Sequence, residues 1–389
     1  MNRKERRAGM SGRAELPPGA KPADPLTLHA MGIDAFRAGQ LEMAADLIGK
    51  AIAADDQVPA FHYNLGIVQK ARGKLKQAAA NYQHAIALKP GYTDAHNNLG
   101  NVWKALGKPD KARASFDRAL LLKPDNPDTH YNLGVLHSEA GDADEAARHF
   151  QHCLEQDPED SRGARILLAR LGCGPAPEHA SHAQMQSIYA VRARSWDQES
   201  RYFGHCLVAQ ALQDHAERAA LDILDIGCGT GLVGALVRNL IPSGARVLDG
   251  IDLSSAMLEK AREKRVYDRL EQADIVSFLS AHEHSYDAIL GAAILIHFGD
   301  LRPLFQAAAQ SLRNRGLFIF TLFSQDHADF AIAASAQLAQ NGCYAHSMGY
   351  VERLAPEYGF SVAALKQAVH EHDSEGNPVS GFVTVLQRA

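Results

Sequence analysis

The sequence has few cysteines and lacks a long hydrophobic run. Its 389 residues include five cysteines, all isolated, and no CxxC pair. Scattered thiols of odd number support neither a disulfide framework nor a zinc cage, so we expect reduced cysteines and no metal site. No apolar stretch approaches the roughly 18 residues of a membrane-spanning helix, and the basic start MNRKERRAG has no apolar segment behind it. We therefore expect a cytoplasmic protein.

A strong charge of one sign is also missing. The chain has 40 Lys and Arg against 45 Asp and Glu, a net charge of -5, so nucleic-acid binding is not expected. Its 46% hydrophobic and 22% charged residues are typical of a globular protein, and at about 150 residues per domain the length predicts two to three domains. Residues 1–24 are rich in Arg, Gly and Pro and predict a disordered basic tail.

A 34-residue repeat runs from residue 25 to residue 172. Two glycines recur at this spacing, one at Gly32, Gly66, Gly100 and Gly134 and the other at Gly39, Gly73, Gly107 and Gly141. Small residues allow antiparallel helices to approach closely, and larger ones such as Tyr82 fill the space between them. The pattern resembles the tetratricopeptide repeat (TPR) family, with four repeats and SRGARILLARLG as a capping helix. One repeat cannot bury its own apolar face, so the four are expected to stack into a helical solenoid.

The first helix of each repeat would line the concave face of such a stack. The polar residues expected there are Asn64, Asn98 and Asn132, joined by Asn97, Asn101, Lys70 and Lys104. An asparagine amide both donates and accepts a hydrogen bond, so it can hold a peptide backbone without selecting its side chains. The ladder resembles one in TPR arrays of the O-linked GlcNAc transferase type, which implies a protein or peptide partner. Alternatively, Asn is simply common at this repeat position, and both interpretations stay open.

The second half of the chain alternates strand and helix patterns. Residues 173–186 are rich in Pro, Gly and polar residues and predict a linker. Short apolar runs follow at 221–226, 245–253, 286–292 and 316–323, with helical stretches between them. Strands and helices in turn predict an α/β domain over 187–389, with a parallel sheet covered on both faces.

A glycine-rich loop, Gly227-Cys228-Gly229-Thr230-Gly231, follows the first strand and precedes a helix. Glycines let the backbone approach a ligand closely, and the loop amides can face a polar group. Three glycines in and after this loop also satisfy the GxGxxG pattern, so a nicotinamide or flavin site is an alternative. Two features argue against this alternative. The strand reaches the loop earlier than the GxGxxG pattern requires, and acidic residues stand before and after the loop, at Asp225 and Asp274.

Three aspartates around this loop match the needs of S-adenosylmethionine. Asp252 closes the second strand and could accept from both ribose hydroxyls. Asp274 could accept from the adenine amino group, and Asp225 could orient the loop or the methionine ammonium. The other residues expected at this cofactor are Gly227, Cys228, Gly229, Thr230, Gly231, Leu253, Met257, Ile275, Ala292 and Tyr189.

Residues 187–389 resemble a class I methyltransferase, and with the repeats the chain resembles the predicted TPR-fused methyltransferases of bacteria. The segments that carry the resemblance are VLDGIDLSSAMLEKAREKRVYDRL, FGDLRPLF, YAHSMGYVERL and PVSGFVTVLQR. The family implies a Rossmann-like sheet of seven strands with the last strand, FVTVLQ, antiparallel. It also implies methyl transfer from S-adenosylmethionine, with the TPR module recruiting a protein partner or substrate.

Two segments depart from the family pattern. Where the family tends to read FDxYA before the first strand, this chain has YAVRA at 189–193, and only the aromatic remains. After the fourth strand the family tends to have an acid and then Tyr, whereas this chain has Ala293 and His297. A scaffold that binds S-adenosylmethionine without catalysis therefore stays an alternative.

The acceptor side of the site is less defined. His297 is the best-placed base for an oxygen nucleophile, or else a histidine of the surface or surrounding wall. Tyr344, His346 and Ser347 are candidates to roof the acceptor pocket, or else form a packed loop. The sequence shows no aromatic stacking platform and no basic groove, so it does not predict the acceptor.

Overall fold

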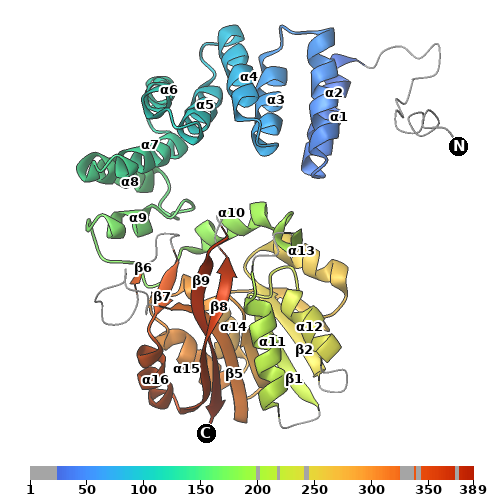
Figure 1. Ribbon diagram of the computed structural model, residues 1–389, viewed down its shortest axis with the longest axis vertical. Helices are drawn as coiled ribbons and strands as arrows, with labels where there is room; N and C mark the ends of the chain where they lie inside the picture. The colour runs from blue at the N-terminus through green and yellow to red at the C-terminus, as the bar shows by residue number, and fades with distance from the viewer. Residues whose placement is uncertain are drawn as a thin grey trace, which may run out of the picture. The chain divides into compact units, whose positions relative to one another are not determined.

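The computed structural model describes residues 24–198, 202–216, 220–240, 245–324, 337–338, 343–372 and 376–389 (Figure 1). Of the expected basic tail, all but Asp24 lies outside these residues. The chain divides into two compact units, Met1–Pro124 and Asp125–Ala389, and each is described by itself. The division falls between the third and fourth repeats of the sequence.

The first unit consists of three antiparallel helix pairs. Their bounds are α1 Pro25–Arg37, α2 Leu41–Ala54, α3 Pro59–Ala71, α4 Leu75–Leu88, α5 Thr93–Ala105 and α6 Pro109–Leu122. Proline begins three of these helices, where its missing N–H has no intrahelical partner in any case. The pairs confirm the 34-residue repeat.

The two recurring glycines have different physical reasons. A Cβ on Gly66 would lie 2.6 Å from Cε1 of Tyr82, so only glycine lets α3 pack on this buried ring. Gly73 has a φ of 72° and ends α3 in the left-handed region, which costs glycine little. The first glycine therefore sets the helix spacing, and the second makes the turn.

The second unit begins with the fourth repeat, α7 (Pro127–Glu139) and α8 (Ala143–Gln156). The short helix α9 (Ala164–Arg170) packs against α8, as expected of the capping segment, through contacts of Ala164 and Leu168 with Phe150 and Cys153. Helix α10 (His182–Arg192) starts inside the expected linker, because Ser181 caps its first turn and Met185 is buried. The last five residues of the expected linker are therefore helical.

The other described residues of this unit form a nine-stranded sheet with helices. The strands are β1 Leu221–Ile226, β2 Ala245–Asp252, β3 Arg269–Gln272, β4 Tyr286–Gly291, β5 Leu312–Ser324, β6 Gln337–Leu338, β7 Tyr344–His346, β8 Phe360–His372 and β9 Pro378–Arg388. The helices are η1 Trp196–Gln198, α11 Gly204–His215, α12 Leu232–Leu240, α13 Ser255–Lys264, α14 Ile275–Ala281, η2 Leu295–His297, α15 Arg302–Ser311 and α16 Met348–Glu357.

The strand order is that of a class I methyltransferase sheet. Strands β3, β2, β1, β4 and β5 are parallel neighbours in this order, and β9 lies antiparallel between β5 and β8. The antiparallel last strand is therefore confirmed. The seven strands that the family implies are β3, β2, β1, β4, β5, β9 and β8. The short strands β7 and β6 add to this number, because they extend the sheet from the end of β5.

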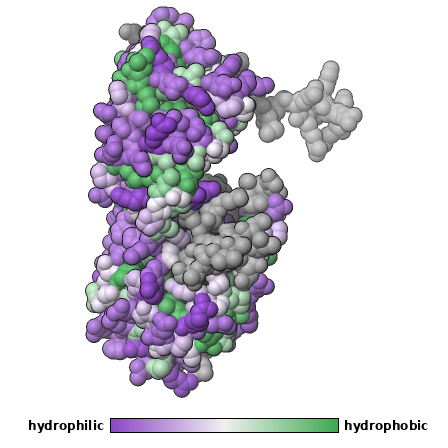
Figure 2. Space-filling view, turned by 90° about the vertical axis from the view of Figure 1, so that its left-hand side faces the viewer, coloured by the Kyte–Doolittle hydropathy of each residue, from purple (hydrophilic) through white to green (hydrophobic). Residues whose placement is uncertain are grey.

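Alternate residues of the central strands pack on opposite faces. In β5, Phe318 and Phe320 belong to the cluster that contains residues of α14, α15 and α16, whereas Leu317 and Ile319 join α11 and α12. Helices on both faces explain why these strands read as continuous apolar runs. Figure 2 shows a largely hydrophilic surface with smaller hydrophobic patches on the face in view. Among the described helices, none is both long and apolar enough to cross a membrane.

Candidate functional site

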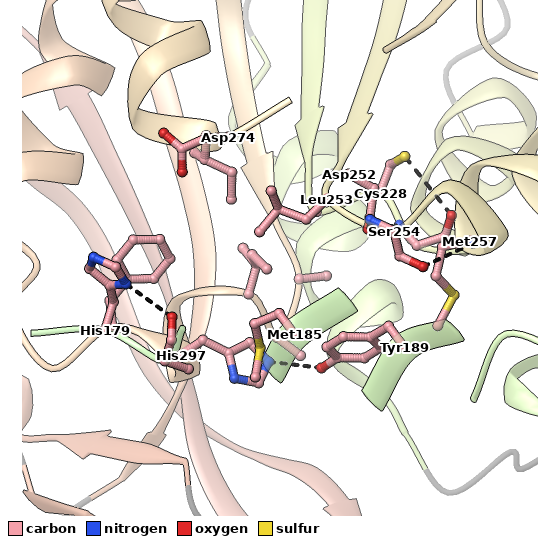
Figure 3. A pocket seen from close by; sticks show the side chains of 18 of the residues that line it. His179, Met185, Tyr189, Cys228, Asp252, Leu253, Ser254, Met257, Asp274 and His297 are labelled. Carbon is pink, nitrogen blue, oxygen red and sulfur yellow. Dashed lines mark hydrogen bonds between the residues drawn. The ribbon is translucent and has the colours of Figure 1, made fainter. Parts of the chain in front are cut away.

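A cavity of about 350 Å³ lies where the carboxyl ends of β1, β2 and β4 meet α10 and η1. Its wall includes most of the expected cofactor residues: Gly227, Cys228, Gly229, Thr230, Asp252, Leu253, Met257, Asp274, Ile275, Ala292 and Tyr189, together with His297. Figure 3 shows Asp274 and Asp252 on different sides of the cavity, with Tyr189 and His297 facing one another. The carboxyl edge of a parallel sheet is the usual ligand site of such folds.

The glycine-rich loop bends sharply under the cavity. Gly227, Gly229 and Gly231 have φ values of 65°, 55° and 90°. A Cβ on Gly227 would lie 2.6 Å from Cγ1 of Ile294, so a larger residue would push into the segment after β4. The amide of Gly229 donates to Oδ2 of Asp252 at 2.9 Å, which joins the loop to the end of β2.

Asp252 and Asp274 are both held by backbone amides. Oδ1 of Asp252 accepts from the Ser254 amide at 2.8 Å, and burial raises the pKa of its carboxyl. Asp274 caps α14 by accepting from the Ser277 amide at 2.9 Å, and its Oδ2 lies 3.2 Å from Nε2 of His182. Burial raises the pKa of Asp274, but these hydrogen bonds and the nearby histidines lower it more, so the carboxylate is ionised.

Asp225 and Gly231 do not line the cavity. Asp225 is fully buried beneath the loop, where its Oδ2 accepts from the Tyr267 hydroxyl at 2.6 Å. Burial raises its pKa to about 7, and the charge of Asp252 adds to this shift. Because Asp225 lies below the loop, it is placed to support the loop and not to contact a ligand directly.

The half-buried Tyr189 and the buried His297 form a pair beside the carboxyl end of β4. The Tyr189 hydroxyl lies 2.8 Å from Nε2 of His297, and His297 is 8% exposed. Burial and the charge of Arg192 lower the pKa of His297 to about 4, so its ring is neutral at physiological pH. Tyr189 and the neutral imidazole therefore share one hydrogen bond, whose donor depends on which ring nitrogen carries the proton.

Asp197 ties the segment after α10 to the glycine-rich loop. Its Oδ1 accepts from the Thr230 hydroxyl at 2.5 Å and its Oδ2 from Nζ of Lys264 at 2.5 Å. Lys264 also donates to the Thr230 carbonyl at 2.7 Å. The sequence interpretation missed Asp197 because it searched for an acid at 189–193, whereas the aromatic and acid, Trp196 and Asp197, come a few residues later.

Aromatic residues outside the expected set also line the cavity. Trp196 contacts Tyr189 and Tyr202, with ring centroids 5.9 Å and 5.8 Å apart, and Tyr202 stacks on His205 at 5.2 Å. The sequence showed no aromatic stacking platform because these residues come from α10, η1, the segment before α11 and α11 itself, and meet only in the fold. Tyr189 was expected at the site, whereas Trp196, Tyr202 and His205 were not.

The three residues proposed to roof the acceptor pocket do not line the cavity. The Tyr344 hydroxyl donates to the Pro177 carbonyl at 2.5 Å, and Nε2 of His346 lies 2.8 Å from the Phe298 carbonyl. Ser347 caps α16 by accepting from the Tyr350 amide. These side chains hold the backbone behind the cavity wall, so they correspond to the packed-loop interpretation.

The asparagines of the repeats are half-buried and already bonded within the solenoid. Nδ2 of Asn64 lies 2.8 Å from Nε2 of His29, and Nδ2 of Asn98 donates to the Tyr63 hydroxyl at 2.9 Å. Asn101 and Lys104 are half-buried on α5, and Asn132 is half-buried on α7 of the second unit. In the described residues, no three His, Cys, Asp or Glu side chains converge as a metal site would require.

Family models match both halves of the chain. One described as a methyltransferase domain matches residues 224–318, and two described as tetratricopeptide repeats match residues 29–93, 69–134 and 104–171. Among curated proteins, malonyl-[acyl-carrier protein] O-methyltransferase of Bacillus anthracis is 25% identical over 166 residues, 40% of this chain and 61% of the relative. The same enzyme of Acetivibrio thermocellus is 32% identical over 28% of this chain and 38% of its own length.

Ubiquinone biosynthesis O-methyltransferase of Citrobacter koseri is 25% identical over 41% of this chain and 68% of its own length. The chain thus spans between 38% and 61% of the length of the first three curated relatives. Among solved structures, MamA is 26% identical with a TM-score of 0.35, covering 36% of this chain and 83% of its own. A methyltransferase from Methanosarcina mazei is 20% identical with a TM-score of 0.37, covering 44% and 93%. The chain therefore combines tetratricopeptide repeats with a segment that matches a methyltransferase domain.

Proposed function

We propose that this chain transfers a methyl group from S-adenosylmethionine to an oxygen of an acceptor that binds between α10 and the carboxyl end of β4. The observation that carries the proposal is the placement of Asp252, Asp274 and the glycine-rich loop around one cavity. An oxygen acceptor is supported by the curated relatives, which are O-methyltransferases.

The cavity wall suits the chemical parts of this cofactor. Two aspartates offer acceptors for ribose hydroxyls and an amino group, while Leu253, Met257 and Ile275 supply apolar surface for a purine. The loop offers backbone amides beside them, and the volume of about 350 Å³ lies within the range of small-molecule sites. When bound, the cofactor supplies a methyl group made electrophilic by its sulfonium.

The protein would contribute alignment and exclusion of water. Met185 and Tyr189 of α10 and Trp196 of η1 cover the cavity opposite the sheet, and Asp197 fixes this cover to Thr230. Holding two reactants in line and dry can supply about 7–11 kcal/mol of a reaction barrier. In this arrangement His297 and Tyr189 shape the wall beside the end of β4, where the acceptor would lie.

Isothermal titration with S-adenosylmethionine tests the cofactor site. Asp252→Asn should weaken binding about 10- to 100-fold, as expected when charge-assisted hydrogen bonds are lost. Asp249→Asn on the same strand is the control, because Asp249 pairs with the Tyr286 hydroxyl away from the cavity and should leave the affinity unchanged. Unchanged affinity in Asp252→Asn would overturn the assignment.

The scaffold without catalysis is the second candidate. The hydrogen bond of His297 with Tyr189 favours it, because this histidine is not presented as an open base. Release of S-adenosylhomocysteine in bacterial extract separates the two candidates. If the protein binds S-adenosylmethionine tightly but releases no more S-adenosylhomocysteine than Asp252→Asn does, only the scaffold candidate remains.

The TPR module is proposed to recruit a protein partner or to present a substrate. Stacked repeats form extended concave surfaces that bind peptides. Asn64 and Asn98 have amides fixed by the first helix of the preceding repeat, so they are oriented before any partner arrives. If Asn64→Ala with Asn98→Ala leaves every co-purified partner unchanged, the asparagine groove has no role. Gln77→Ala on α4 serves as the surface control.

A further inference from the structure

We propose that Tyr267 is a positioning residue for the cofactor site. Its hydroxyl holds the carboxylate of Asp225 beneath the glycine-rich loop, where a negative charge favours a positively charged ligand. The proposal rests on the proposed function, because that ligand is S-adenosylmethionine with its sulfonium and ammonium. Tyr267 lies in the segment between α13 and β3 and is not among the described lining residues, so it would act through Asp225 and the loop.

Three glycines make room for the ring of Tyr267. A Cβ on Gly234 would lie 2.5 Å from its Cζ, and a Cβ on Gly250 would lie 3.0 Å from its Cδ1. A Cβ on Gly231 would lie 3.1 Å from its Cε2, although the φ of 90° already favours glycine there. Gly234 has no positive φ, so the ring alone explains this glycine. The third glycine of the GxGxxG pattern, Gly234, therefore accommodates Tyr267 and does not indicate a dinucleotide site.

The segment that carries Tyr267 is fixed from two sides. Nε of Arg238 on α12 donates to the Val266 carbonyl at 2.9 Å. The Leu248 amide on β2 donates to Oδ2 of Asp268 at 2.7 Å, and the Asp268 amide donates to the Leu248 carbonyl at 2.8 Å. The phenol is thus held between α12, β1 and β2 before any ligand binds.

The Tyr267 hydroxyl makes two hydrogen bonds at once. It donates to Oδ2 of Asp225 at 2.6 Å and accepts from the Gly234 amide at 3.3 Å. Oδ1 of Asp225 has no hydrogen-bond partner among the described residues, so this phenol supplies the bond that the ionised carboxyl needs. Gly234 belongs to the first turn of α12, just after the loop, so the same hydroxyl joins β1 to the start of that helix.

The groups around Asp225 determine its charge. Burial raises its pKa to about 7, the hydrogen bond from Tyr267 lowers it, and the charge of Asp252 raises it further. The other titratable neighbours are Cys228 in the loop and Tyr202 before α11, and burial raises the pKa of both so that they stay protonated. None of these four groups is a cation. A bound cation would therefore favour the ionised carboxylate, and by reciprocity the ionised carboxylate would favour the cation.

Calorimetric titration of the full-length protein with S-adenosylmethionine at pH 7 and pH 9 tests the proposal. Tyr267→Phe removes only the hydroxyl, so burial keeps more of Asp225 protonated near pH 7. The affinity should fall about three- to tenfold at pH 7, and the loss should shrink to about twofold or less at pH 9, where Asp225 is ionised in both proteins. This dependence concerns binding alone, so it does not appear in the transfer rate at saturating cofactor.

Tyr286→Phe is the matched control, because the Tyr286 hydroxyl donates to Oδ2 of Asp249 at 3.1 Å away from the cavity. It should match the wild type at both pH values, and the ligand's own ammonium titrates alike in every protein compared. A loss in Tyr267→Phe that is equal at pH 7 and pH 9, or no loss at all, would overturn the proposal alone. A wild type that does not bind S-adenosylmethionine would overturn the proposed function and this proposal together.

A second pair of variants tests whether Tyr267 acts through Asp225. In Asp225→Asn the titrating carboxyl beneath the loop is gone, so adding Tyr267→Phe should change the ratio of the affinities at pH 7 and pH 9 by less than about twofold. A pH-dependent loss of the same size in both backgrounds would contradict the role of Asp225. Unfolding midpoints recorded at both pH values separate a loss of folding from a loss of affinity.

Discussion

The Tyr189 hydroxyl lies 2.8 Å from Nε2 of His297, although 108 positions separate the two residues in the sequence. One comes from the helix that covers the cavity, and the other from the turn after β4. Their hydrogen bond closes the cavity wall beside the proposed acceptor, so His297 is not presented to the acceptor as an open base.

The first prediction is a flat pH profile for methyl transfer. His297 has a pKa of about 4, so it stays neutral from pH 6 to pH 8 and its protonation does not change the rate in that range. His297→Gln, which can still form a hydrogen bond with Tyr189, should lower kcat/KM less than about tenfold, whereas loss of a general base costs about 10²- to 10⁴-fold. A rise of rate with pH through about 6.5, abolished in His297→Gln, would restore His297 as the base.

The second prediction concerns stability in mild acid. Burial lowers the pKa of His297 and of His370 to about 4, below the value of about 6.5 in an unfolded chain. Between pH 6.5 and pH 4 the unfolded chain binds protons that the folded chain does not, so the stability is full above pH 6.5 and falls as the pH falls. Each histidine should remove on the order of 2 kcal/mol between pH 7 and pH 5.

Urea unfolding at the two pH values measures this loss. His370→Gln should reduce the difference between pH 7 and pH 5, because glutamine does not titrate and can still bond to the Thr321 hydroxyl, which lies 3.0 Å from Nε2 of His370. His215→Gln, on the half-buried end of α11, is the control and should leave the difference as it is. A difference in His370→Gln as large as in the wild type would contradict the prediction.

The third prediction compares two aspartates of β1. Burial raises the pKa of Asp225 to about 7, so above pH 7 its ionised form costs stability. Asp225→Asn should therefore stabilise the cofactor-free protein at pH 8, on the order of 4 kcal/mol, and lose this gain below about pH 4. Asp222 has its pKa lowered by Arg246, so Asp222→Asn should destabilise at pH 8. Thermal unfolding that shifts both variants in the same direction would count against this account.

The fourth prediction concerns the close contact between helices α3 and α4. Gly66→Ala places a Cβ against the buried ring of Tyr82 and should cost about 1–3 kcal/mol, as overpacked cores do. Gly91→Ala faces open space, with no atom within 4 Å, and should change stability by less than about 0.5 kcal/mol. Chemical denaturation of the two variants measures this, and a second change, Tyr82→Leu, should recover part of the loss. Equal stability of the two alanine variants would show that the helices can separate freely.

The fifth prediction is that Asp197 contributes to cofactor affinity. Asp197→Ala leaves Thr230 and Lys264 without their shared carboxylate, so S-adenosylmethionine should bind about tenfold more weakly. Asp214→Ala on α11 removes only a surface bond from Gln210 and should bind like the wild type. Calorimetric titration of both variants is decisive, with unfolding midpoints recorded alongside. If Asp197→Ala binds as tightly as Asp214→Ala, the link between η1 and the loop is structural only.

The sequence alone predicted the elements whose pattern is local. β1 was predicted at its observed bounds because its leucines and isoleucines are interrupted only by Asp222 and Asp225 and are followed directly by the glycine-rich loop. The repeats were found because Gly66 and its equivalents have a steric cause that recurs every 34 residues. By contrast, β8 was not predicted, since its AALKQAV segment has helical propensity and becomes a strand through pairing with β9.

For the candidate site too, local signals were predicted from the sequence and long-range contacts were not. Asp252 and Asp274 were predicted because Asp252 ends β2 and Asp274 follows the end of β3, and the ends of parallel strands meet at one edge. Trp196, Tyr202 and His205 were not predicted, because no spacing along the chain indicates that these three side chains meet at one cavity. Asp225 was expected among the ligand contacts, and its burial under the loop depends on the Tyr267 hydroxyl from a segment about 40 residues away, which only the fold reveals.

The capping helix of the repeats reaches the cover of the cavity. Ile166 of α9 packs with Ala180 and with Met185 of α10, and Tyr189 and Leu253 adjoin this cluster. A methyltransferase grafted onto another repeat array by joining the two at residue 186 would therefore leave Met185 behind and lose the floor on which α10 rests. Residues 125–389 form one compact unit that keeps this cluster together with the fourth repeat, so an exchange of repeat arrays is better joined at residue 125 than at residue 186.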